Sequence, residues 1–159
     1  MRLLFFLLLL LSICCSSPED SYLYEINPIE LTSSTIEKTK QKTTDQYISI
    51  LYANLFQKAL SANELVEIRQ SIESIGDKNL AHEIVISNFM NRSDVLVPSD
   101  EEMRADLDQF LLDTYKRFLV REPSQAEKKF LKTMILSNPD IQPELVYFSF
   151  AMSEEYQFY

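Results

Sequence analysis

Apolar residues recur at three- and four-residue intervals along most of the chain after residue 43, which is the spacing of one face of an α-helix. This pattern predicts three helices within residues 44–90. Ser61 and Glu64 have the spacing of a capping box at the start of the second helix, and Gly76 is placed to end it. The apolar positions of the three helices are Tyr47, Ile48, Leu51, Tyr52, Leu55 and Phe56; Leu65, Ile68, Ile72 and Ile75; and Leu80, Ile84, Val85 and Phe89.

The same kind of pattern returns after a connection at residues 91–98. Ser99 with Glu102 and Ser124 with Glu127 are two further predicted capping boxes, and Pro143 suits the first turn of a last helix. The first of these boxes is expected to open one long helix, so residues 101–159 are also predicted to form three helices. Their apolar positions are Leu107, Leu111, Tyr115, Phe118 and Leu119; Phe130, Leu131, Met134 and Ile135; and Leu145, Phe148 and Met152.

The two halves align at a constant shift of 63 residues. Generic amphipathic helices would align in apolar phase, but they would not also align their caps and turns. The matched pairs are Tyr52 with Tyr115, Leu55 with Phe118, Phe56 with Leu119, Lys58 with Arg121, Ser61 with Ser124, Glu64 with Glu127, Ile68 with Leu131, Ile72 with Ile135 and Asp77 with Asp140. We therefore expect an all-α fold of about six helices without a sheet, in which residues 44–90 and 101–159 are two copies of a three-helix unit packed into one bundle.

The first fifteen residues predict export. Met1 and Arg2 precede an unbroken apolar run at residues 3–11, which is too short for a membrane span of ~20 residues and is typical of a signal peptide. Residues 11–15 then resemble the lipobox of bacterial lipoproteins, in which a cysteine after small residues is acylated, with palmitate for example. The resemblance implies lipid attachment at Cys14 or Cys15 and a place in the bacterial envelope, with the outer membrane favoured. An ordinary secretory signal that is cleaved near residues 16–17, or an uncleaved anchor, is the alternative.

Residues 16–43 differ from the helical part of the chain, because they are rich in Ser, Thr and Pro and show no sustained apolar period. We interpret them as a flexible polar tether between residues 1–15 and a helical domain at residues 44–159. Lys38, Lys40 and Lys42 form a small basic group within it. These lysines either contact anionic headgroups or belong to a solvated linker, and the second interpretation is favoured.

The composition of the chain argues against several classes of function. The chain has 159 residues, one His and a net charge of −9, which argues against nucleic-acid binding and against His-based zinc sites. No cysteine follows Cys15, so the domain has no disulfide and no thiolate nucleophile. Paired acids such as Glu154 and Glu155 are expected on a solvated surface. We accordingly expect that the protein binds no metal and no cofactor and is not an enzyme. The alternative is a carboxylate-dependent hydrolase of envelope glycans.

Residues 115–127 (YKRFLVREPSQAE), together with residues 153–156 (SEEY), resemble a repeat of secreted bacterial proteins of unknown function and of phycobilisome linker polypeptides. The first half keeps only the skeleton of this pattern, with Lys58 in place of Arg121. The resemblance implies a helical assembly or adhesion module without catalytic residues. From the sequence, Arg121, Pro123 and Glu127 are expected to hold a structural turn; the alternative is that Arg121 binds the carboxylate of a ligand.

The C-terminal segment is unusually aromatic, and its rings fall around most of the last helix. Exposed aromatics with acids at their rim are typical of partner surfaces. We therefore expect either a protein-binding surface or a last helix that is central in the bundle. The candidate surface residues are Tyr147, Phe150, Tyr156, Phe158 and Tyr159. Together these observations predict a lipid-anchored, non-enzymatic binding or scaffolding protein of the envelope, with a structural lipoprotein that has no specific partner as a further alternative.

Overall fold

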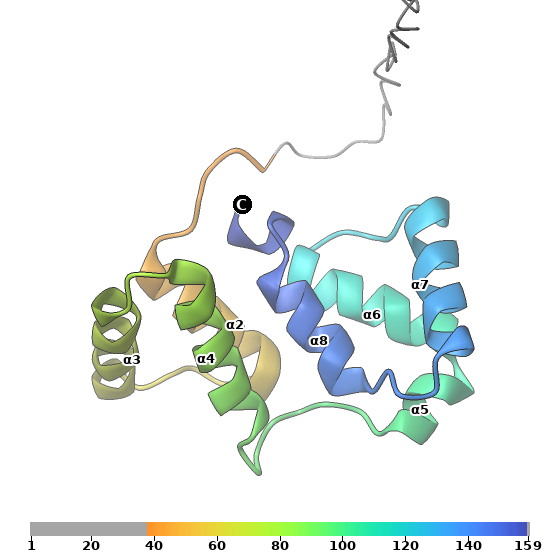
Figure 1. Cartoon of the computed structure of the whole chain (residues 1–159), viewed down its shortest axis with the longest axis horizontal. Coiled ribbons are helices and arrows are strands. Elements are labelled where there is room, and N and C mark those ends of the chain that lie inside the picture. The colour runs from red at the N-terminus through yellow and green to blue at the C-terminus, as the bar shows by residue number, and fades with distance from the viewer. Residues whose placement is uncertain (1–37, 159) are drawn as a thin grey trace, which may run out of the picture. The chain divides into compact units, whose positions relative to one another are not determined.

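The computed structural model describes residues 38–158, so Cys14, Cys15 and Tyr159 lie outside the described residues. The fold is all-α, as predicted (Figure 1). Its elements within the described part are α2 (Thr44–Phe56), α3 (Ala62–Ser74), α4 (Lys78–Met90), α5 (Asp100–Ala105), α6 (Leu107–Leu119), α7 (Gln125–Ser137), α8 (Pro143–Met152) and the 3₁₀-helix η2 (Glu155–Gln157). None of these helices has both the length and the hydropathy that a membrane span requires.

The helix boundaries repeat along the chain. Shifted by 63 residues, α2 coincides with α6 and α3 coincides with α7, residue for residue. The residue after α2 and the residue after α6 both adopt the left-handed conformation, with φ of 52° at Gln57 and 56° at Val120. A β-branched residue such as Val is seldom found there. The two halves therefore share helix order, the lengths of their first two helices and the unusual turn; we call α2–α4 the first repeat and α6–α8 the second repeat.

The third helices align at a different shift. The connection before α4 is residues 75–77, whereas the connection before α8 is residues 138–142. These two extra residues change the shift to 65, so the cap residue Asp77 corresponds to Gln142. The predicted match of Asp77 with Asp140 was wrong, because Asp140 lies inside the longer connection.

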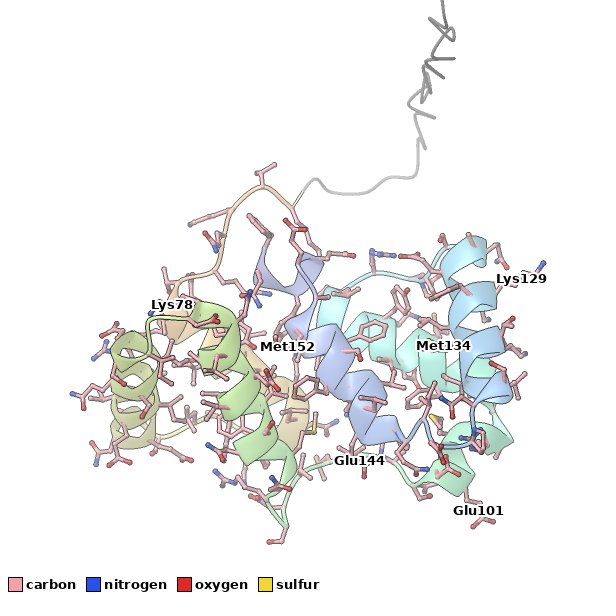
Figure 2. All side chains as sticks on the ribbon, viewed as in Figure 1. Lys78, Glu101, Lys129, Met134, Glu144 and Met152 are labelled. Carbon is pink, nitrogen blue, oxygen red and sulfur yellow. The ribbon has the colours of Figure 1, made fainter. Side chains whose placement is uncertain are left out.

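One hydrophobic core serves both repeats. Between the repeats, α4 packs against α8, and Figures 1 and 2 show the two helices side by side with their first turns at opposite ends. The connection from α4 to α5 also joins the repeats. The amide of Leu96 donates to the carbonyl of Leu55, and Arg117 donates to the carbonyl of Leu96 at 3.0 Å.

Two local predictions need correction. The long helix expected after Ser99 is broken at Asp106, whose φ of −145° and ψ of 81° are not helical and whose side chain caps α6. Arg104 in the resulting short helix α5 donates to the carbonyls of Ile135 and Ile141, which tertiary packing alone brings near. Gly76 has no positive φ, so it is not a left-handed helix cap.

Residues 38–43, which the sequence assigns to the predicted tether, lie on the domain. We call these residues the strap. Lys38 donates to the carbonyl of Leu119 at 2.6 Å and pairs with Glu155 at 3.2 Å, while the amide of Lys42 donates to the carbonyl of Gln157 at 2.8 Å. The boundary at residue 43 was therefore wrong, since contacts made through the backbone and lysine tips leave no apolar period in the sequence.

Candidate functional site

The predicted aromatic surface is mostly core. Tyr147, Phe150 and Tyr156 are 3%, 8% and 0% exposed, so the expectation that they form a partner surface was wrong for these three residues. Phe158 is half-buried and forms an isolated β-bridge with Gln41 of the strap. The rings are covered because α8 lies between α4 and α6, which agrees with the alternative of a central last helix.

Tyr156 closes this core. Its ring stands edge-on to Tyr47, with centroids 5.8 Å apart, and tilted to Phe118 at the same separation. The hydroxyl accepts a hydrogen bond of 3.0 Å from Asn54, and the Lys42 ammonium lies 4.1 Å from the ring centroid. Burial raises the pKa of Tyr156 above its ordinary range. Tyr156 thus joins the C-terminal segment, α2, α6 and the strap.

The predicted turn residues come together around Arg121. Its guanidinium donates to Glu155 through Nε and Nη2, at 2.7 Å each, and to Glu127 through Nη1 at 3.0 Å and Nη2 at 2.6 Å. The remaining Nη1 hydrogen is directed to the carbonyl of Glu122, and the guanidinium carbon lies 5.0 Å from the centroid of Tyr115. All five donors of the guanidinium are therefore used within the domain, which leaves none for a ligand carboxylate.

These contacts stabilise the charged forms of both partner acids. The hydrogen bonds from Arg121 lower the pKa of Glu127 to about 2 and also lower the pKa of Glu155. Glu127 in addition accepts from the backbone amide of Ser124, as the predicted capping box requires. Pro123 lies half-buried in the same turn. The arrangement ties the start of α7 to the end of the chain, so its role is structural.

The first repeat builds the same arrangement with an arginine from another position. Arg92 follows α4, pairs with Glu64 at 2.6 Å and lies 5.4 Å from the centroid of Tyr52. Tyr52 and Glu64 correspond to Tyr115 and Glu127, but the residue that corresponds to Arg121 is Lys58, which pairs with Asp94 at 2.6 Å. Arg92 was missed in the sequence because nothing in its local pattern places it near Glu64. The Glu64 side chain does not complete the predicted capping box with Ser61, although the Ser61 side chain accepts from the amide of Glu64.

Replacing Arg121 with Met should destabilise the domain by about 2 kcal/mol. The change leaves Glu127 and Glu155 partly buried without their shared cation, and hydrogen bonds to charged groups each contribute roughly 1.5–3 kcal/mol. Urea unfolding at pH 7 measures the difference. Lys116→Met, in the last turn of the preceding helix α6, is the matched control, because its pair with Glu122 is exposed and should contribute under ~1 kcal/mol. Equal losses in the two variants would contradict the structural role of Arg121.

The same cluster predicts how stability depends on pH. Because folding lowers the pKa of Glu127 from 4.5 to about 2, its contribution is present above pH 4.5 and is lost as the pH falls towards 2. The free energy of unfolding of the wild type should therefore fall more between pH 5 and pH 3 than that of Glu127→Gln. Parallel pH profiles would show that Glu127 contributes no acid dependence.

The exposed face of α7 distinguishes the second repeat from the first. Phe130 and Leu136 are 67% and 62% exposed, with the exposed Thr133 between them. The corresponding positions of α3 are Glu67, Gln70 and Glu73, which are all exposed. We call residues 129, 130, 133 and 136 the α7 face, and residues 66, 67, 70 and 73 the α3 face.

Within residues 38–158, no group of three His, Cys, Asp or Glu side chains is arranged to hold a metal ion. No protein-family model, no curated protein and no solved structure matches the chain. The resemblance of residues 115–127 to the repeat of linker polypeptides therefore stays a prediction.

Proposed function

We propose that this chain is a lipid-anchored lipoprotein of the bacterial envelope whose helical domain binds or scaffolds another envelope component without catalysis. The lipobox-like segment that ends in Cys14 and Cys15 supports the anchor. The observation that carries the binding role is the α7 face, where Phe130 and Leu136 stand in solvent.

The fold itself does not need these two apolar side chains. After the shift of 63 residues, α3 of the first repeat begins and ends at the same positions as α7 of the second repeat. It carries Glu67 and Glu73 where α7 carries Phe130 and Leu136. Covering an exposed large apolar side chain with a partner stabilises the complex, by roughly 1.5–3 kcal/mol for each fully buried residue. The difference between the repeats therefore favours a surface kept for association.

Three acids of the domain are held in ion pairs, which supports binding rather than hydrolysis at these positions. Glycosidase chemistry uses two carboxyl groups that face one another across a cleft, ~5–10 Å apart. Glu127 and Glu155 share Arg121, and Asp108 pairs with both Lys128 and Lys132. These carboxylates are committed to ion pairs with cations of the domain.

The binding role is tested with the full-length protein captured from native membranes in mild detergent. The double variant Phe130→Glu and Leu136→Glu gives the α7 face the side chains that the first repeat carries, so the fold should be retained. We expect specific envelope proteins, including further copies of this chain, to be recovered with the wild type and lost with the variant. The control Leu80→Glu changes an exposed leucine on α4 and should retain them. Identical recoveries from wild type and double variant would refute a binding role for the α7 face.

A further inference from the structure

The α7 face and the α3 face are complementary in charge. The α7 face carries one lysine, Lys129, and no acid, whereas the α3 face carries two glutamates, Glu67 and Glu73, and no basic residue. Their net charges are thus +1 and −2 in a chain whose total is −9. The equivalent faces of α7 and α3 therefore carry charge of opposite sign.

The exposed residues show the complementarity in more detail. On α7, Phe130, Thr133 and Leu136 lie three residues apart and form one strip, with Lys129 pointing away from the domain beside it (Figure 2). On α3, the strip of Glu67, Gln70 and Glu73 has the exposed Val66, at 38%, in the position of Lys129. Each face therefore offers apolar area together with charge of one sign.

The two faces cannot meet within one molecule. Helices α3 and α7 lie at opposite sides of the helical domain (Figure 1). A contact between the α7 face of one copy and the α3 face of another leaves one free face of each kind at the ends of the pair. Further copies can therefore bind at these free faces. A twofold-symmetric contact, in contrast, forms a closed pair of two copies.

We propose that the α7 face binds the α3 face of a second copy of this chain, so that copies associate head to tail. This inference rests on the proposed function and names the partner for the same surface. Phe130 and Leu136 lose their exposure to water against the aliphatic parts of the α3 face and Val66, while Lys129 faces Glu67 and Glu73. Anchoring of the copies in one membrane raises their local concentration, which lets a small contact suffice.

The test uses full-length copies that carry two different C-terminal tags, produced in the same cells and captured in mild detergent through one tag. Wild-type copies should capture each other. Capture should fall at least about tenfold when both copies carry Phe130→Glu and Leu136→Glu, or when both carry Glu67→Lys and Glu73→Lys. Leu80→Glu in both copies is the control and should leave the capture unchanged.

Mixing the two blocked proteins identifies a head-to-tail contact. A copy with a blocked α7 face keeps its α3 face, and a copy with a blocked α3 face keeps its α7 face, so the mixed pair should recover capture although neither variant captures itself. A twofold-symmetric contact through either face predicts no recovery. Failure of the mixed pair, or full capture by either variant alone, would overturn the proposal.

Repeating the capture with the two purified full-length proteins removes any bridging protein. If purified wild-type copies fail to capture each other while native membranes still yield another envelope protein through Phe130 and Leu136, the self-association is wrong and the binding function stands. If neither partner is recovered, both the inference and the proposed function fail.

Discussion

Replacing Cys14 and Cys15 together with Ser is expected to move the full-length protein from the membrane fraction to the soluble fraction. Acyl chains contribute ~0.8 kcal/mol for each CH₂ buried in the bilayer, and more than one chain is required for stable anchoring. None of the described helices is long and apolar enough to span the membrane in place of the acyl chains. The measurement is fractionation followed by an alkaline wash, which removes peripheral proteins and retains lipid-anchored ones.

The single variants show which cysteine is acylated. Cys14→Ser and Cys15→Ser should differ, because only the acylated cysteine is required for anchoring. Metabolic labelling with palmitate should disappear in the same variant that leaves the membrane. Retention of the double variant in the membrane after the alkaline wash would refute the lipoprotein interpretation and favour an uncleaved apolar anchor at residues 3–11.

Replacing Tyr156 with Ala should destabilise the domain by about 3–5 kcal/mol and lower its melting temperature by roughly 10–15 °C. The ring is fully buried among Tyr47 and Phe118, and its removal leaves a cavity at the point where the strap and the C-terminal segment meet. Thermal unfolding, followed by circular dichroism at 222 nm, measures the change.

Two further variants separate the contributions of Tyr156. Tyr156→Phe removes only the hydrogen bond from Asn54 and should cost about 1 kcal/mol. Phe158→Ala changes a half-buried ring two residues later and should cost less than Tyr156→Ala. Truncation after Ser153 should be at least as harmful as Tyr156→Ala, because it also removes Glu155, one of the two acids that pair with Arg121. A truncated protein with wild-type stability would show that the C-terminal segment does not belong to the core.

The sequence alone determined the helical fold and its repeat. Ser99 and Ser124 both begin helices with the predicted capping boxes, and the shift of 63 residues read from side chains reappears in the boundaries of α2 with α6 and α3 with α7. These features are local. Caps and apolar period act over a few residues, so they are visible in a short stretch of chain.

Other features were decided only by the tertiary structure. Asp106 ends a helix that its own sequence would continue, and Arg92 takes the place beside Glu64 that the alignment gives to Lys58. The C-terminal aromatics were ambiguous because a helix with rings on most sides suits either a central position or a surface. Their burial depended on the helices packed around α8.

The α7 face also combines a property that the sequence determines with one that only the tertiary structure decides. The residues of α7 were read from the sequence as an ordinary amphipathic helix with Phe130 on its apolar side, and burial alone revealed that Phe130 and Leu136 stand in solvent. Apolar character is a property of one residue and can be read directly. Exposure depends on contacts between residues far apart in the chain, such as those of α7 with α6, and these form only when the helices pack.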